Sequence, residues 1–183
     1  MTDVLVVGGG PAGLSAALFT AKNGLDTVVY DTDETWLHSA HLFNYLGIES
    51  KDGEAFLEDA REQVEGFGVD RRDGEVTGVQ QSDGGFIATT EDGETEATYL
   101  VLATGTDRSL AEELGCTFDG DVVDVTVSME TSVDGAYATG AMVRDQEWQA
   151  IISAGDGGAA ALDILSKEEG EHFHDFDTPD DAE

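Results

Sequence analysis

The chain has little cysteine, little positive charge and no long apolar run, and each shortage excludes a class of protein. Cys116 is the only cysteine among 183 residues, so neither a disulfide nor a Cys-x-x-Cys redox motif can form within one chain. No apolar stretch approaches the ~18 residues that a membrane-spanning helix needs. An apolar strand pattern begins at the first residues and leaves no room for a signal peptide. We therefore expect no membrane partner and a cytoplasmic location.

Positive charge is scarce, since 8 Lys and Arg residues face 40 Asp and Glu residues, for a formal net charge of -32. Without a basic patch that could release counterions, binding to nucleic acid is not expected. Such a surface repels itself unless salt screens it, and in molar salt the Debye length falls to ~3 Å. The composition is typical of proteins from extreme halophiles. A disordered acidic chain is disfavoured, because 40% of the residues are hydrophobic and fall into clear strand patterns.

A glycine-rich turn directly follows the first apolar strand, Val4 to Val7. Gly8 suits the sharp turn, Gly10 lets the backbone approach a diphosphate, and Gly13 lets the next helix lie close to the strand. The diphosphate would then sit at the helix N-terminus. The turn predicts a dinucleotide site whose residues include Gly8, Gly10, Pro11, Ala12 and Gly13.

A carboxylate stands at the end of the second apolar strand, Thr27 to Tyr30. This residue, Asp31, can accept hydrogen bonds from the ribose hydroxyls of an adenine dinucleotide. An Asp at this point suits FAD and NAD(H) equally, so an NAD(H)-binding Rossmann protein remains an alternative.

Three further segments resemble the FAD domain of thioredoxin reductases and their pyridine nucleotide-disulfide oxidoreductase relatives, and the resemblance covers most of the chain. They are Leu100–Gly105, which ends in Ala-Thr-Gly, Thr131–Gly140, and Gln149–Gly157. A shorter segment, Asn44–Ile48, is similar to one that lines the isoalloxazine ring in that family, but it lacks the family's proline. The resemblance implies FAD as the cofactor, bound by Asn44, Val76, Thr104, Gly105, Gly140, Ala141, Gln149 and Ala150 in addition to the glycine turn and Asp31.

The resemblance also implies what is missing. In the family an NADPH domain of ~100 residues or more lies between the Ala-Thr-Gly strand and the late flavin segment, whereas here 25 residues separate Gly105 from Thr131. The family's Gly-Asp pair, whose carboxylate binds the ribityl chain, reads Gly140-Ala141 here. One lost charge-assisted hydrogen bond weakens binding by about one to two decades. Because the NADPH domain and a Cys-x-x-Cys disulfide are both missing, we do not expect a working thioredoxin reductase.

The predicted fold class is α/β: a Rossmann-like FAD-binding domain with a central parallel sheet, helices and a three-stranded antiparallel β-meander layer. We expect one domain over residues 1–166 and an acidic, mobile tail over 167–183. A helix is predicted over 52–66, a third strand from Val69, and a last helix over 149–166. Asp-Gly turns separate the meander strands, predicted over 75–79, 85–89 and 94–98.

Few side chains are candidates for chemistry. His38 and His41 precede Asn44 and are weak candidates for a proton relay to the flavin or a substrate. Cys116 is expected to be an inert, half-buried residue. His172 and His174 lie in the acidic tail, where we expect no metal site.

Two functions remain open from the sequence. The first is an FAD-dependent oxidoreductase that exchanges electrons with an outside donor. Its open flavin face would be covered by a redox partner protein, a second copy of the chain, or the tail with Phe173 and Phe176. The second is a non-catalytic FAD-binding or cofactor-free regulatory or assembly module, which Ala141 favours.

Overall fold

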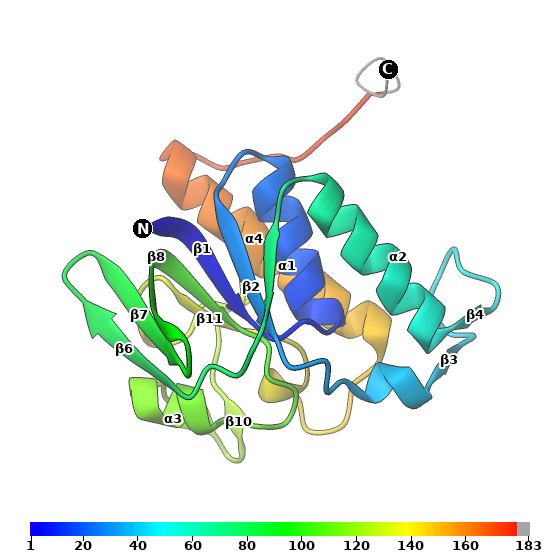
Figure 1. Ribbon diagram of the computed structural model, residues 1–183, viewed down its shortest axis with the longest axis horizontal. Helices are drawn as coiled ribbons and strands as arrows, with labels where there is room; N and C mark the ends of the chain where they lie inside the picture. The colour runs from blue at the N-terminus through cyan, green and yellow to red at the C-terminus, as the bar shows by residue number, and fades with distance from the viewer. Residues whose placement is uncertain (179–183) are drawn as a thin grey trace.

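The computed structural model describes residues 1–178, which fold around one seven-stranded sheet (Figure 1). The parallel strands are β1 (Thr2–Val7), β2 (Thr27–Asp31), β5 (Asp70–Asp73), β11 (Ala136–Ala138) and the second half of β8 (Gly93–Leu102). Two antiparallel strands, β6 (Gly78–Ser82) and β7 (Gly85–Thr90), extend the sheet in the order β5-β2-β1-β8-β7-β6. The predicted α/β, Rossmann-like fold is confirmed.

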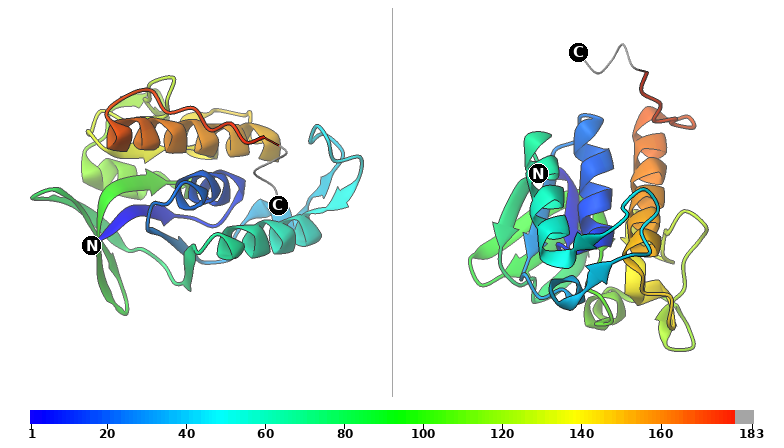
Figure 2. Two further views of the ribbon diagram at one scale, coloured as in Figure 1. Left: turned by 90° about the horizontal axis from the view of Figure 1, so that it is seen from above. Right: turned by 90° about the vertical axis from the view of Figure 1, so that its right-hand side faces the viewer.

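Side chains of the central strands alternate between two cores, because successive residues of a strand point to opposite faces. Val4 and Val6 pack in the core under helices α1 (Pro11–Lys22), α2 (Gly53–Gly66) and α4 (Ala150–Glu169). Leu5 and Val7 belong to the opposite core, which the short helix α3 (Ser109–Leu114) covers. Figure 2 shows α1, α2 and α4 side by side on their face of the sheet. The central strands are therefore apolar on both faces, as parallel strands usually are.

Strand β8 explains a difference from the predicted meander. The third meander strand and the strand that ends in Ala-Thr-Gly form one continuous strand of ten residues. Its first half pairs antiparallel with β7, and its second half pairs parallel with β1 and β11. The meander thus extends the central sheet. Its first strand begins at Gly78, which leaves Val76 in the loop after β5.

The predicted helices are present with small shifts at their ends. Helix α2 begins at Gly53 after Asp52, whose side chain accepts a hydrogen bond from the backbone N–H of Glu54 at 3.1 Å. Helix α4 continues three residues beyond the predicted Ser166 and ends at Glu169, before Gly170 in a left-handed conformation. Among residues 1–178, no helix combines the length and the apolar character that crossing a bilayer requires.

Short elements complete the edges of the fold. The 3-10 helix η1 (Trp36–Ser39) leads to a small hairpin of β3 (His41–Leu42) and β4 (Lys51–Asp52). Between Gly105 and Thr131 the chain forms α3 and a second hairpin of β9 (Phe118–Asp119) and β10 (Val122–Val123). A second 3-10 helix, η2 (Gly140–Val143), follows β11.

The described part of the C-terminal tail lies along α1 and α4. Lys22 of α1 forms ion pairs with Asp175 and Asp177, each at 2.6 Å, and the N–H of Phe173 donates to Ser166 Oγ at 3.0 Å. Figures 1 and 2 place this segment at the amino ends of the strands. Phe173 and Phe176 therefore lie far from the residues predicted to bind the flavin. The predicted tail also covers residues 179–183, which lie outside the described residues.

Helices α1 and α4 touch along their backbones, and Gly157 makes this possible. A Cβ at Gly157 would lie 2.0 Å from the carbonyl oxygen of Ala12, so Gly157→Ala should lower the free energy of unfolding by about 1–3 kcal/mol. Gly155→Ala is the matched control, since a Cβ there meets nothing within 4 Å and alanine favours the helix. Urea unfolding followed by circular dichroism would measure both variants. Equal stabilities would show that the two helices can move apart without loss.

Candidate functional site

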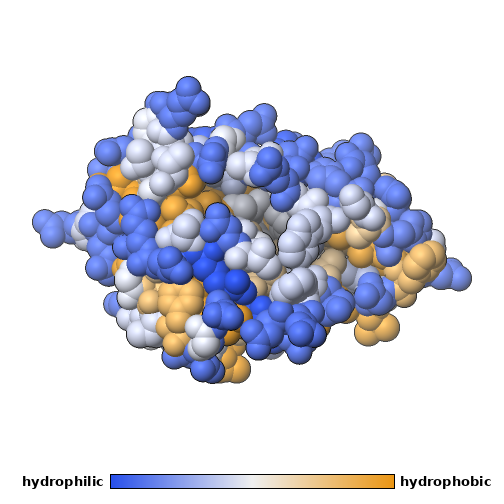
Figure 3. Space-filling view, turned by 90° about the horizontal axis from the view of Figure 1, so that it is seen from below, coloured by the Kyte–Doolittle hydropathy of each residue, from blue (hydrophilic) through white to orange (hydrophobic). Residues whose placement is uncertain are grey.

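A cavity of about 890 Å³ opens at the carboxyl ends of the parallel strands. Its walls include the residues that follow β1, β2, β8 and β11: Gly8, Thr32, Ala103 and Thr139. Strand β1 pairs with β2 on one side and with β8 on the other, so the chain leaves β1 in one direction across the sheet and later returns on its other side. Ligands of open α/β sheets bind at such a switch point. Figure 3 shows the hollow on this face of the molecule.

The glycine turn lines the cavity, and at two of its residues neighbouring backbone leaves no room for a side chain. A Cβ on Gly8, whose φ is +115°, would lie 2.3 Å from the carbonyl oxygen of Ala103. A Cβ on Gly13 would lie 1.9 Å from the carbonyl oxygen of Gly8. Gly13 does not line the cavity; it holds α1 against the turn, so its effect on a ligand passes through the backbone.

The N-terminus of α1 is available to an anion. Gly10 stands at the cap position without a side-chain hydrogen bond, and no acidic residue occupies the first turn. The first N–H groups of a helix lack partners within it, and they carry the positive end of the helix dipole. Because Gly10, Pro11 and Ala12 line the cavity, the geometry fits a diphosphate at this point.

Asp31 lies at the end of β2, on the cavity wall, and only 5% of its surface is exposed. Its Oδ1 accepts from the N–H of Asp33 at 2.9 Å, and its Oδ2 accepts from Arg61 Nη2 of α2 at 3.0 Å. Arg61 also bonds Asp33, whose φ of +59° is in the left-handed region. The guanidinium compensates the charge of Asp31, so a carboxylate can stay buried beside a ligand's ribose.

The other residues predicted from the family resemblance also converge on the cavity. Asn44 comes from the loop between β3 and β4, Thr104 and Gly105 from the end of β8, and Gly140 and Ala141 from η2. Gln149 and Ala150 come from the N-terminus of α4, and Val76 from the loop after β5. Segments distant in sequence thus form one wall.

The two histidine candidates separate in the structure. His41 lines the cavity, and its Nε2 shares a hydrogen bond with Ser50 Oγ at 2.9 Å. His38 does not line it; its ring lies between Glu54 Oε2 at 2.5 Å and Asp33 Oδ1 at 2.9 Å. Glu54, and then Asp33, raise the pKa of His38 above its ordinary value. His38 therefore belongs to a surface ion-pair network, and a proton relay to the cavity has no geometric support from it.

Two arginines bond the segment that follows Gly140 or its neighbours, and no local pattern in the sequence predicts these contacts. The only indication is that cations are rare in this chain. Arg108 Nη2 donates to the carbonyl oxygen of Ala141 and Arg108 Nε to that of Met142, both at 2.9 Å. Arg144 forms a two-bond ion pair with the buried Asp156 of α4, at 2.6 and 3.0 Å. These two arginines fix the backbone that follows Gly140.

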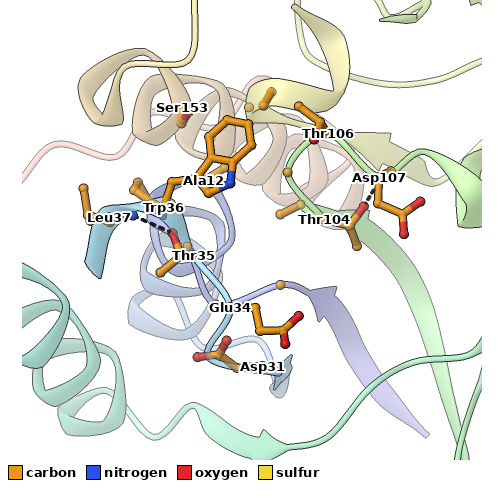
Figure 4. Close-up of a pocket in the computed structure, with 18 of the residues that line it drawn as sticks. Ala12, Asp31, Glu34, Thr35, Trp36, Leu37, Thr104, Thr106, Asp107 and Ser153 are labelled. Atoms are coloured by element: carbon orange, nitrogen blue, oxygen red, sulfur yellow. Dashed lines mark hydrogen bonds between the residues drawn. The ribbon is translucent and has the colours of Figure 1, made fainter. Parts of the chain in front are cut away.

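The charge on the cavity wall is negative. Four carboxylates line it, from Asp31, Glu34, Glu75 and Asp107, and no Lys or Arg lines it among the described residues. The N–H of Ser109 bonds Asp107 and lowers the pKa of that carboxyl. Figure 4 shows Asp31 and Glu34 on one side of the pocket and the Trp36 ring on another. Attraction for an anionic ligand must therefore come from backbone N–H groups.

Cys116 lies outside the cavity, buried in the core beneath α3. Burial raises the pKa of its thiol. A thiol with a raised pKa is a poor nucleophile at neutral pH, so Cys116 is a structural residue within the chain.

These features define an α/β protein with a cavity at the switch point of its sheet that suits a dinucleotide, and comparisons with known proteins narrow the class. The pyridine nucleotide-disulphide oxidoreductase family matches residues 2–110. The chain therefore belongs to the pyridine nucleotide-disulphide oxidoreductase family.

Among characterised relatives, the F component of alkyl hydroperoxide reductase in Staphylococcus aureus is 32% identical over 107 residues, which are 56% of this chain. The same protein of Staphylococcus epidermidis is equally similar. The chain spans only 21% of the length of these relatives.

Solved structures of thioredoxin reductases have the same fold. The atypical thioredoxin reductase TRi from Desulfovibrio vulgaris Hildenborough matches with a TM-score of 0.86 at 20% identity, over 93% of this chain and 99% of that one. A thioredoxin reductase from Gloeobacter violaceus also gives 0.86, at 22% identity over 96% and 99%. A ferredoxin-flavin thioredoxin reductase from Clostridium acetobutylicum gives 0.81, at 18% identity over 93% and 99%. The fold is thus that of these thioredoxin reductases.

The His38 network predicts a pH-dependent contribution to stability. A raised folded-state pKa means that the network stabilises the fold fully below about pH 6.5, the ordinary pKa of histidine. That stabilisation is lost as the pH rises through the folded-state pKa. His38→Gln should therefore lower the melting temperature at pH 6 and change it less at pH 9. The control is His172→Gln, because His172 is exposed and bonds only the carbonyl of its neighbour Phe173. A loss that is the same at both pH values would contradict the assignment.

Proposed function

We propose that the chain binds FAD in this cavity and acts as an oxidoreductase without an NADPH domain or redox disulfide of its own. One observation carries the proposal: the glycine turn, Asp31 and the two ends of the late segment, Gly140–Ala141 and Trp148–Ala150, line a single cavity at the switch point of the sheet. Family membership supports a flavin in that place.

The lining residues suggest how each part of FAD would be held. Asp31 would accept hydrogen bonds from the adenosine ribose, with Val76 beside the adenine. The N-terminus of α1 would bind the diphosphate. Asn44 and Gln149 would lie toward the flavin ring.

Bound flavin supplies the capacity to accept and release one or two electrons. The chain's own residues would bind and orient the cofactor and keep water from part of its surface. His41 is the one imidazole on the cavity wall among the described residues, and it could hold a proton there. The carboxylates on the wall supply no group that would attract a second anionic dinucleotide.

Electrons must reach the flavin from outside this chain. A redox partner protein or a second copy of the chain would then cover the open side of the cavity. The described part of the tail lies at the amino ends of the strands, so it does not fill this role.

Ala141 favours a second function, a non-catalytic FAD-binding or cofactor-free module. At this position the chain lacks the carboxylate that the family resemblance predicts. Rapid reduction and reoxidation of bound flavin would separate the oxidoreductase from this module.

The first test is cofactor binding by purified protein in molar salt. Incubation with FAD should give a protein-bound visible absorption band near ~450 nm, and NAD⁺ should not compete at similar concentrations. Asp31→Asn should raise the Kd for FAD about 10- to 100-fold, because charge-assisted hydrogen bonds contribute about 1.5–3 kcal/mol.

Asp83→Asn is the matched control, since Asp83 is exposed in the turn between β6 and β7. It should leave the Kd unchanged. A wild-type protein that stays colourless with excess FAD would refute the proposal and leave the cofactor-free module.

Restoring the missing carboxylate should strengthen the site. Ala141 lines the cavity, and its backbone is already fixed by Arg108. Ala141→Asp should therefore lower the Kd for FAD about tenfold, measured by equilibrium dialysis. Ala141→Asn, which has the same shape without the charge, separates the effect of charge from that of size. Weaker binding by the Asp variant would mean that the ribityl chain does not pass this residue.

A further inference from the structure

The only two tryptophans of the chain, Trp36 and Trp148, meet at the cavity. Trp36 comes from η1 and Trp148 from the loop before α4, yet their ring centroids lie 5.3 Å apart. Both side chains stay open to solvent, at 61% and 42% exposure. Large exposed aromatic groups gathered at one cavity are typical of a ligand site.

The ring of Trp148 is held in place without a ligand, and the ring of Trp36 packs against it. Trp148 Nε1 donates to the carbonyl oxygen of Arg144 at 3.1 Å, and Arg144 is fixed by its ion pair with Asp156. Trp36 opens η1, where the side chain of Thr35 accepts from the N–H of Leu37. The aromatic surface is therefore organised before a ligand arrives, which reduces the entropy lost on binding.

The pair lies beside two segments that line the cavity, the N-terminus of α4 and the glycine turn. Trp148 directly precedes Gln149 and Ala150 at the N-terminus of α4. Gly10, at the N-terminus of α1, lies on the other side of the pair, since a Cβ there would be 3.6 Å from Oγ1 of Thr35, the residue before Trp36. No Lys or Arg among residues 1–178 lines the cavity beside the tryptophans. A ligand that fits both features, the helix N-terminus and the aromatic pair, has a charged diphosphate and a planar, uncharged ring system.

We propose that Trp36 and Trp148 form the binding surface for the isoalloxazine ring of FAD. The inference rests on the proposed function and assigns two residues that hold the ring. The two indole planes are tilted by 53°, so a flat ring that stacks on one meets the other at an angle. Offset-stacked and edge-to-face contacts are the favoured aromatic arrangements. The pair thereby covers part of the flavin with this chain's own side chains.

Flavin emission and FAD affinity test the proposal together. Contact with an indole quenches flavin emission, whereas a phenyl ring preserves stacking without strong quenching. The double variant Trp36→Phe, Trp148→Phe should bind FAD within about threefold of wild type and recover the emission of the bound flavin. Trp36→Ala and Trp148→Ala should each raise the Kd about tenfold, as lost aromatic contacts do. ADP, which lacks the ring, should bind all variants equally in dialysis.

Phe67→Ala is the control, since Phe67 is an aromatic residue that is 47% exposed and lies outside the cavity lining. It should change neither the emission nor the Kd. If FAD binds and the tryptophan variants match wild type in both measurements, the assignment of the pair is wrong while FAD binding stands. If the wild-type protein binds no FAD, the proposed function itself fails.

Discussion

The structure depends on close backbone contact around the first turn and helix. Three positions without a Cβ create it: Gly8 against Ala103, Gly13 against Gly8, and Gly157 against Ala12. These contacts join β1, α1, β8 and α4 at the point where the cavity begins. Since protein interiors are tightly packed and change volume only at a cost, the backbone N–H groups at the N-terminus of α1 are held in fixed positions. A backbone site of this kind needs no cationic side chain to receive an anion.

The second constraint is the shortage of positive charge. The chain has only 8 Lys and Arg residues. The arginines near the cavity bond groups around it without lining the cavity themselves. Arg61 balances Asp31 from α2, Arg108 bonds the carbonyl oxygens of η2, and Arg144 ties the next loop to Asp156. Such arrangements keep the carboxylates and carbonyls of the site satisfied while the wall itself stays negative. The arginines thus act on the site through other residues.

The sequence was sufficient to predict the parts of the site that depend on local chemistry. The glycine turn and Asp31 follow from a strand, a turn and a second strand, so short patterns identify them. The boundary of β8 was not predictable, because whether Thr98 and Leu100 belong to one strand depends on which neighbours pair with each half. From its place in the sequence, shortly before Asn44, His38 is expected to lie beside the cavity. The direction of its ring depends on Glu54 and Asp33, which only the folded chain brings to it.

The contact between the two tryptophans also could not be predicted from local sequence. Trp36 and Trp148 are separated by more than half of the chain, and nothing in either local pattern indicates that their rings touch. The contact arises because the end of β2 and the N-terminus of α4 meet at the cavity. Hence two kinds of information build this site. Local sequence sets the glycine turn, while the sheet topology brings the two tryptophans together beside it.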